Sequence, residues 1–413
     1  MKSLNFKYKF GLVGKGISHS FSKELHKYFG NYEYNLYDLD EHEIKDFILR
    51  KNYKGLNITM PYKRIAYNLC DFISSEAKEI GCVNTIVNRE GKIYGYNTDF
   101  FGFKSMLIYN GITLKDKKVI ILGSGGASLT VQAVARSMEA KEIIVISRTG
   151  KNNYGNISKH FDADVVINAT PVGMYPNLYD EIIDISKFEN CKDVIDIIYN
   201  PLRTRLLAKA SLCGKNTVNG LMMLIMQGLE ASNLFMGKSQ EISIDKIKYC
   251  IERNKRNVIL IGMPSSGKTT LGRVVSKELN MRFIDSDEEI YIKYGKTPEE
   301  IISAYGEEKF RIIEKDVILD ISKLNGVVIS TGGGVILNDE NMINLMTNGT
   351  IFYVERSLNL LDKNSLPAKR AGNLESLYNQ RKKLYRKYSE YVVDNNGTIN
   401  EARLSLINRV IYK

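Results

Sequence analysis

KKVIILGSGGAS (Lys117–Ser128) and RNVILIGMPSSGKTT (Arg256–Thr270) are two apolar runs that each end in a glycine-rich turn. In both, a helix-like segment follows the turn. Strand-like and helix-like segments also alternate along the rest of the chain, which is typical of α/β architecture. The sequence therefore predicts parallel sheets whose strands end in turns suited to phosphate.

The length of 413 residues predicts two or three domains, at roughly 150 residues each. We expect a substrate-binding α/β domain at 1–107, joined by returning helices at 215–237, and a Rossmann-like nucleotide domain at 108–214. The polar segment 238–256 reads as a linker, and 257–413 as a P-loop domain with a parallel sheet.

Composition excludes several classes of protein. Hydrophobic residues at 44% and charged residues at 25% exclude a disordered, collagen-like or disulfide-scaffold chain. The five cysteines form no CxxC pair, so we expect no structural zinc site and a location in the reducing cytoplasm. The N-terminus does not read as a signal peptide, and the longest apolar stretch, Leu221–Met226, is too short to span a bilayer.

The net charge of +11 has three readings: a solvated lysine-rich surface, steering of small polyanions such as nucleotides, or nucleic-acid binding. No RRM, zinc-finger or basic-helix pattern accompanies the charge, and aromatic platforms in a basic groove are lacking. We therefore expect small-molecule substrates and neither a nucleic-acid nor a membrane partner.

The second glycine turn has the pattern G-x-x-x-x-G-K-T after a strand and before a helix. Its backbone N–H groups can surround phosphate oxygens, its lysine can reach the β- and γ-phosphates, and its threonine can ligate magnesium. The sequence predicts ATP contacts at Gly262, Gly267, Lys268, Thr269 and Thr270.

FIDSDEEI places Asp285 and Asp287 two residues apart at the end of the next predicted strand. One carboxylate can help hold magnesium while the other accepts a hydroxyl proton, as transfer to an alcohol requires. With GEEKFRIIE, STGGGVI and a late Arg381, this set resembles shikimate kinase over Asn257–Lys413.

The resemblance implies that Asp287 is the base and contacts the shikimate hydroxyls, while Asp285 joins Thr269 at magnesium. It implies that Arg311 and Arg381 clamp the carboxylate and that the backbone of Gly333 approaches the ring. The sequence departs from the family in its lid, NSLPAKRAG, where Leu366 stands in place of an arginine. Either Lys363, Lys369 or Arg370 supplies that charge, or this part is a slow or regulatory nucleotide-binding module.

The first glycine turn is followed by a strand that ends in Ser147, Arg148 and Thr149, with no acidic residue. An NAD site would use an Asp or Glu for the ribose hydroxyl, whereas arginine and a hydroxyl accommodate a 2′-phosphate. The cofactor is therefore expected to be NADP(H).

Clusters of small polar residues lie upstream and downstream of this turn: HSFS (19–22), NITMPYK (57–63), GCVNT (81–85), YNTDF (96–100), NATPVGM (168–174) and NGLMMLIMQ (219–227). A lysine and an aspartate in one pocket suit hydride transfer to a ketone, whose oxygen must gain a proton. In this order, the clusters resemble shikimate dehydrogenase over about residues 8–237.

This resemblance implies that Lys63 and Asp99 are the catalytic pair and that Tyr199 closes over the substrate. The expected substrate contacts are Ser20, Ser22, Asn57, Thr59, Asn84 and Gln227. The expected NADP contacts are Gly123, Gly125, Gly126, Ala127, Arg148, Thr149 and Met174.

Together, the two resemblances predict a bifunctional enzyme of aromatic amino acid biosynthesis that uses NADPH, ATP and Mg²⁺. It would reduce 3-dehydroshikimate to shikimate and phosphorylate the product at its 3-hydroxyl. The alternative is an active dehydrogenase fused to the slow or regulatory module. A homo-oligomer is left open.

Overall fold

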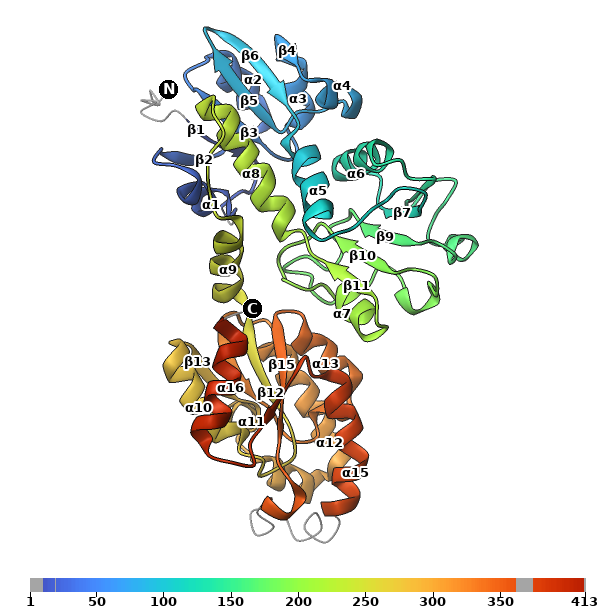
Figure 1. Cartoon of the computed structure of the whole chain (residues 1–413), viewed down its shortest axis with the longest axis vertical. Helices are drawn as coiled ribbons and strands as arrows, with labels where there is room; N and C mark the ends of the chain where they lie inside the picture. The colour runs from blue at the N-terminus through green and yellow to red at the C-terminus, as the bar shows by residue number, and fades with distance from the viewer. Residues whose placement is uncertain (1–9, 19, 362–373, 412–413) are drawn as a thin grey trace. The chain divides into compact units, whose positions relative to one another are not determined.

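The computed structural model describes residues 10–18, 20–361 and 374–411. They form two compact units (Figure 1). The first comprises Met1–Val172, Ile183–Tyr199 and Lys215–Tyr249, and the second comprises Gly173–Ile182, Asn200–Gly214 and Cys250–Lys413. The first unit contains two sheets and the second contains one, so the predicted α/β fold with parallel sheets is confirmed.

The first sheet of the first unit has the strand order β2-β1-β3-β5-β6-β4. It is mixed, because β5 runs antiparallel to both β3 and β6. Its strands are β1 (Phe10–Gly14), β2 (Tyr34–Asp38), β3 (Gly55–Ile58), β4 (Phe72–Ile73), β5 (Thr85–Arg89) and β6 (Lys92–Tyr96). Its helices are α1 (Ser22–Phe29), α2 (Glu41–Leu49), α3 (Lys63–Asn68) and α4 (Ser75–Ile80).

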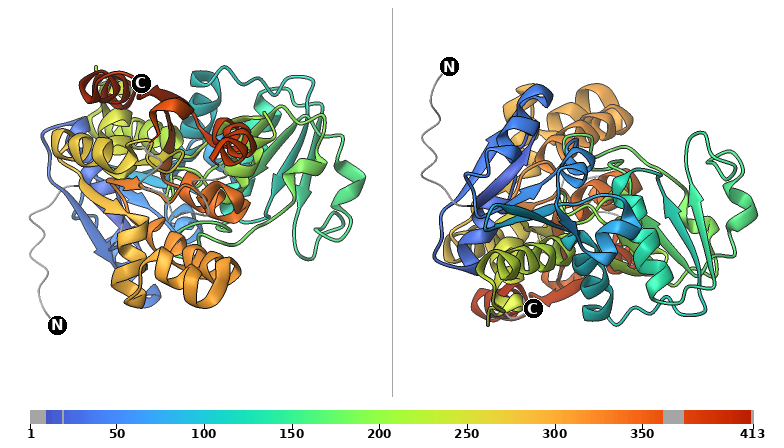
Figure 2. Two further views of the ribbon diagram at one scale, coloured as in Figure 1. Left: turned by 90° about the horizontal axis from the view of Figure 1, so that it is seen from below. Right: turned by 90° about the horizontal axis from the view of Figure 1, so that it is seen from above.

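The second sheet is wholly parallel, with the order β11-β10-β9-β7-β8. Its strands are β7 (Lys118–Leu122), β8 (Glu142–Ile146), β9 (Val165–Asn168), β10 (Asp193–Asp196) and β11 (Asn216–Val218). Helix α6 (Gly126–Ser137) follows β7, as the glycine turn predicts, and short 3₁₀ turns lie at Ile157–His160 and Ile185–Lys187. Figure 2 gives two further views of these elements.

Two helices, α5 (Thr98–Tyr109) and α8 (Leu221–Met236), pack against the sheets of the first unit. Helix α5 and the start of α8 share a core with β7 and β9, through Phe103, Met106 and Met222. The end of α8 packs on β1 through Ala231 and Phe235. Helix α8 therefore contacts the cores of both sheets, while the expected assignment of 215–237 to the substrate-binding domain stays a prediction.

The second unit is built on a parallel sheet with the order β13-β14-β12-β15-β16. Its strands are β12 (Asn257–Ile261), β13 (Arg282–Asp285), β14 (Val327–Ser330), β15 (Gly349–Glu355) and β16 (Tyr391–Asp394). Its helices are α10 (Lys268–Leu279), α11 (Ser286–Tyr294), α12 (Pro298–Ile321), α13 (Asp339–Met346), α15 (Leu374–Tyr388) and α16 (Ile399–Ile411), and 3₁₀ turns lie at Val335–Leu337 and Leu358–Leu360.

Strand β12 is buried on both faces. Ile259 and Ile261 belong to a core shared with α12, α13 and α15, whereas Val258 and Leu260 belong to a core shared with α10 and α16. This explains the unbroken apolar run in the sequence, because a strand covered on both sides needs no polar alternation. The phosphate-type turn therefore starts from the buried central strand of this sheet.

Helix α7 (Arg205–Leu212) also belongs to the second unit. There the buried guanidinium of Arg205 donates to both carboxylate oxygens of Glu340, at 2.9 and 2.7 Å, and to Asn344 at 2.8 Å. Nη2 makes both contacts with Glu340 and Nη1 makes the contact with Asn344, so Arg205 joins α7 to two residues of α13.

Two helices lie at the predicted domain limits. Helix α5 crosses residue 107, and α9 (Ile244–Lys255) lies within the segment expected as a linker. The finer division at 107, 214 and 256 stays a prediction. In the described ranges, none of the helices combines the length and the apolar character needed to cross a membrane.

Candidate functional site

The edge of the first sheet brings together three of the predicted motifs. Asn57 at the end of β3 is paired with Thr85 at the start of β5, which is paired in turn with Tyr96 at the end of β6. Because β5 is antiparallel to its neighbours, its first residue lies beside their last residues. Asn57, the GCVNT segment and the start of α5 therefore meet at one edge.

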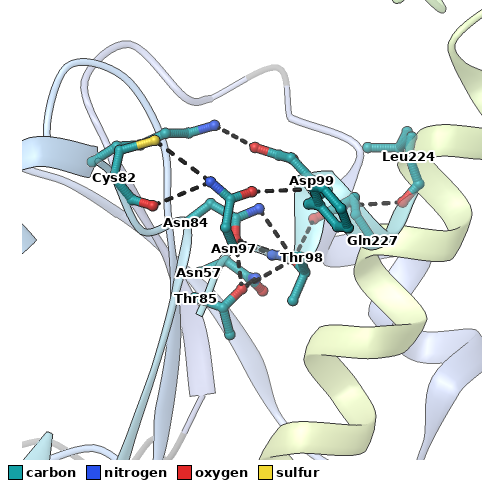
Figure 3. A network of polar contacts seen from close by, with 11 residues as sticks. Asn57, Cys82, Asn84, Thr85, Asn97, Thr98, Asp99, Leu224 and Gln227 are labelled. Carbon is teal, nitrogen blue, oxygen red and sulfur yellow. Dashed lines mark hydrogen bonds and ion pairs between the residues drawn. The ribbon is translucent and has the colours of Figure 1, made fainter. Parts of the chain in front are cut away.

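Asn57 is held by hydrogen bonds in this buried edge, and Figure 3 shows the one with Thr85. Its Oδ1 accepts from the hydroxyl of Tyr34 at 2.7 Å, and its Nδ2 donates to the Thr85 hydroxyl at 3.0 Å. These contacts fix the direction of the amide.

Asn84 is fixed in the same way by Thr98 (Figure 3). Its Oδ1 accepts from the backbone N–H of Thr98 at 2.7 Å, and its Nδ2 donates to the Thr98 hydroxyl at 3.1 Å. The same hydroxyl lies 3.5 Å from Oε1 of Gln227 on α8. Three of the predicted substrate residues, Asn57, Asn84 and Gln227, thus belong to one hydrogen-bonded network, which can bind a molecule rich in hydroxyl groups.

Lys63 and Asp99 form an ion pair beside this network. Nζ of Lys63, the first residue of α3, lies 2.6 Å from Oδ2 of Asp99, in the first turn of α5. The two side chains are 25% and 18% exposed. Burial disfavours the Lys63 ammonium, but the charge of Asp99 and its hydrogen bond outweigh that effect and raise the pKa of Lys63. The lysine is therefore a cation at neutral pH, able to donate a proton.

Ser20, Ser22 and Tyr199 form a second group of predicted substrate residues. The Ser20 Oγ accepts from the backbone N–H of Ser22 at 3.2 Å, and the two hydroxyls are 3.1 Å apart. Phe21, which lies between these serines, meets the ring of Tyr199 edge-on with centroids 5.7 Å apart. Thr59 follows β3 and donates its backbone N–H to Val13 at the end of β1, at 2.9 Å.

The glycine turn after β7 faces open space. Gly125 is the N-cap of α6, and a side chain at Gly125 or Gly126 would meet no protein atom within 4 Å. Such a space in front of a helix N-terminus fits a dinucleotide pyrophosphate.

Arg148 and Thr149 lie just beyond β8, beside that turn. The N–H of Gly123 donates to the carbonyl of Ile146, the last residue of β8, at 2.8 Å. Arg148 and Thr149 follow two and three residues later and are exposed. Met174 belongs to the second unit, where its side chain is exposed, and its nucleotide contact stays a prediction.

The second unit places Lys268 in the turn after β12. Its ammonium donates to the carbonyls of Gly262 and Met263, at 3.1 and 2.8 Å. Burial lowers the pKa of Lys268 to about 8, against the opposing charges of Asp287 and Asp285. The buried hydroxyl of Ser266, in the same turn, has no hydrogen-bond partner among the described residues. Both features fit a turn built around phosphate oxygens, which would satisfy these donors.

The residues expected at magnesium are in contact. The Thr269 hydroxyl donates to Oδ2 of Asp285 at 2.9 Å, and Oδ1 of Asp285 accepts from the backbone N–H of Asp287 at 3.0 Å. Thr269 is on α10 and Asp285 ends β13, so two strand-to-helix junctions provide the oxygen ligands that magnesium prefers.

Asp287 has the electrostatics of a base. Burial, together with the neighbouring charge of Asp285, raises the pKa of Asp287 to about 6, while Lys268 acts in the opposite direction. A carboxylate with this pKa is ionised at neutral pH and is a stronger proton acceptor than an ordinary aspartate.

The three glycines after β14 are crowded by three different parts of the site. A Cβ at Gly332 would lie 3.0 Å from Oδ1 of Asp287, a Cβ at Gly333 would lie 2.6 Å from the ring of Pro264, and a Cβ at Gly334 would overlap the Arg311 guanidinium. Absence of side chains at Gly332–Gly334 therefore lets the base, the phosphate turn and an arginine converge on one backbone segment.

Arg311 and Arg381 converge on this segment from α12 and α15. Arg311 donates to Glu314 at 2.8 Å and to Glu307 at 2.7 Å. Arg381, 5% exposed, donates through Nη1 to the carbonyl of Gly333 at 3.0 Å. Its buried Nε has no partner in the described part of the chain, so it can donate to a bound anion.

Several residues at these sites were not expected from the sequence. Tyr34 gives no signal beyond its place in a short strand, and Thr98 lies in the YNTDF motif, where Asp99 is the residue expected to take part in the reaction. Asn395, which follows β16, donates to the carbonyl of Ser266 at 2.7 Å and packs against the phosphate turn. The lid residues 363, 366, 369 and 370 lie outside the described residues.

Comparison with known proteins assigns both parts. Residues 12–86 match the family model of the shikimate dehydrogenase substrate binding domain, and residues 264–411 match that of shikimate kinase. The chain is 36% identical over 258 residues to a shikimate dehydrogenase (NADP(+)) of Clostridium perfringens, an alignment covering 57% of this chain and 94% of the relative. A Methanococcus maripaludis shikimate dehydrogenase (NADP(+)) is also 36% identical, over 262 residues, with 57% and 94% covered.

Solved structures support the same assignment of the dehydrogenase part. Shikimate dehydrogenase 1 of Peptoclostridium difficile is 33% identical with a TM-score of 0.55, and 59% of this chain and 97% of that one are covered. A chorismate mutase/shikimate 5-dehydrogenase fusion protein of Clostridium acetobutylicum is 32% identical with a TM-score of 0.57 and the same coverage. The chain therefore belongs to the shikimate dehydrogenase family and has a shikimate kinase domain in its C-terminal part.

Proposed function

We propose that this bifunctional shikimate-pathway enzyme reduces 3-dehydroshikimate with NADPH at the Lys63–Asp99 pair. We further propose that it phosphorylates the 3-hydroxyl of shikimate with MgATP at Asp287. The main support is that each unit brings opposite charges together in its site: Lys63 lies 2.6 Å from Asp99 in the first, and Lys268 interacts electrostatically with Asp287 in the second. A homo-oligomer and the cytoplasmic location stay predictions.

In the reduction, NADPH supplies the hydride when bound. Lys63 donates a proton to the ketone oxygen as that oxygen becomes negative, and Asp99, 2.6 Å away, orients the ammonium and balances its charge. Asn57, Asn84 and Gln227 bind the ring hydroxyls, since their amide directions are fixed by neighbouring hydroxyl groups. The serine group with Tyr199 binds the rest of the substrate.

In the phosphorylation, MgATP supplies the phosphoryl group when bound. Asp287 accepts the proton of the 3-hydroxyl, and Lys268 stabilises negative charge on the phosphates. Thr269 and Asp285 would hold magnesium. The free Nε of Arg381 and the guanidinium of Arg311 bind the carboxylate of shikimate.

One assay separates this proposal from the regulatory alternative. The full chain, given 3-dehydroshikimate, NADPH and MgATP, should oxidise NADPH and then release ADP only after shikimate has formed. NADPH oxidation without shikimate-dependent ADP release would favour the regulatory module.

The missing lid arginine predicts that Leu366→Arg raises kcat of the kinase, as measured by ADP release.

Lys63→Ala should lower kcat of the dehydrogenase by about 10²- to 10⁴-fold, because the ketone oxygen loses its proton donor. The KM for NADPH should change by less than about twofold, since Lys63 acts on the substrate. Steady-state kinetics test this, with the exposed Lys45→Ala as the control. Near-normal turnover would remove Lys63 from the mechanism.

Arg148→Ala should weaken NADPH binding by roughly 1.5 to 3 kcal/mol, the scale of a charged hydrogen bond, and leave NADH binding nearly unchanged. Titration of both cofactors measures the difference. Arg136→Ala, which removes an exposed arginine of α6 paired with Glu79, is the matched control. Equal losses for NADPH and NADH would assign Arg148 another role.

The kinase kcat/KM should fall as the pH drops below about 6, by about tenfold per pH unit, because Asp287 becomes protonated at its raised pKa. An ordinary aspartate would keep its activity down to about pH 4. A pH profile of ADP release tests this. A profile that stays flat down to pH 5 would exclude Asp287 as the base.

Asp287→Asn should abolish the kinase and increase the free energy of unfolding of the second unit by about 1 to 3 kcal/mol near pH 7.5. The raised pKa means that the folded state disfavours the charge, a penalty fully present above about pH 6 and absent below about pH 4. Asp316→Asn removes a carboxylate of lowered pKa and should bring no gain. Equal effects of both substitutions on chemical denaturation would contradict this.

A further inference from the structure

Tyr385 on α15 is buried against the segment Gly332–Gly334 of the kinase domain. Its hydroxyl donates to the carbonyl of Gly333 at 2.6 Å, and the side chain is fully buried. Its ring stacks on that of Tyr353 in β15, with centroids 5.0 Å apart and an angle of 13° between the rings. Burial raises the pKa of the Tyr385 hydroxyl, so it remains a donor throughout the neutral range.

Gly333 is fixed from two sides. Its carbonyl accepts from both Tyr385 and Nη1 of Arg381, the latter at 3.0 Å, which occupies both lone pairs of the oxygen. On the other side its Cα faces the ring of Pro264 in the phosphate turn, so closely that no Cβ would fit. One peptide unit therefore connects α15 to the turn that binds phosphate.

We infer that Tyr385 is a positioning residue for phosphoryl transfer, acting through the Gly333 carbonyl. Tyr385 fixes the direction of this carbonyl. In that direction the carbonyl accepts from Nη1 of Arg381, and Nε of Arg381 stays free for the substrate carboxylate. Tyr385 also sets the distance between the acceptor and the phosphate turn, on which in-line transfer depends. The inference rests on the proposed kinase activity.

Tyr353 provides a matched control. It is also buried, and its ring is the other half of the stacked pair. Its hydroxyl, however, has no hydrogen-bond partner within the described residues. Tyr353→Phe and Tyr385→Phe thus remove the same atom from adjacent rings, but only the second removes a contact with the site.

The experiment compares the full-length wild type with these two variants. In Tyr385→Phe we expect the KM for shikimate to rise about 5- to 10-fold and kcat of the kinase to fall about tenfold, the scale of one misplaced contact. The KM for MgATP and the dehydrogenase kinetics should stay within about twofold of wild type. Tyr353→Phe should match wild type in all of these constants and have an equal or higher melting temperature.

Three results would overturn the inference. One is a Tyr385→Phe variant with unchanged kcat and unchanged KM for shikimate. Another is a fall in kcat that leaves every KM unchanged and tracks the folded fraction, which indicates a structural role alone. The third is an equal loss in both variants, which assigns the effect to ring packing. A wild type that oxidises NADPH but never releases ADP with shikimate would instead refute the kinase function itself, and the inference with it.

Discussion

Strand direction determines where the groups at the strand ends of both sites lie. In the second unit all strands are parallel, so the turn after β12, Asp285 at the end of β13 and the glycines after β14 lie at one edge. In the first sheet the single antiparallel strand β5 brings its first residue, Thr85, to the edge where β3 and β6 end. Both sites follow from this constraint, and the side chains at these ends then determine the chemistry.

The two sites differ in how well their charged groups are compensated by neighbouring charges. Lys63 and Asp99 are in direct contact, and the lysine keeps its positive charge. Lys268 and Asp287 are less well compensated, and their pKa values move to about 8 and about 6, toward neutrality. The kinase site therefore contains groups that are costly to ionise in the folded protein, which is typical of a site whose charges are completed by a ligand.

Much of this arrangement could be predicted from the sequence, because glycine turns after apolar runs are local signals. The strand-turn-helix units around Gly123 and Gly262 lie where the motifs place them. Contacts between distant segments could not be predicted in this way. The bond from Tyr34 to Asn57, and that from Tyr385 to Gly333, join residues 23 and 52 positions apart, and no spacing rule links them. Their geometry depends on the packing of whole elements.

The path of the chain limits how this protein can be divided. Gly173–Ile182 and Asn200–Gly214 belong to the second unit, although the residues on either side of each segment belong to the first. Arg205, from one of these segments, is bound to Glu340 within the second unit. A break near residue 250 keeps residues 264–411, the matched shikimate kinase domain, but leaves the C-terminal fragment without α7. The kinase domain expressed without the first part of the chain would therefore lose the guanidinium that binds Glu340 and Asn344.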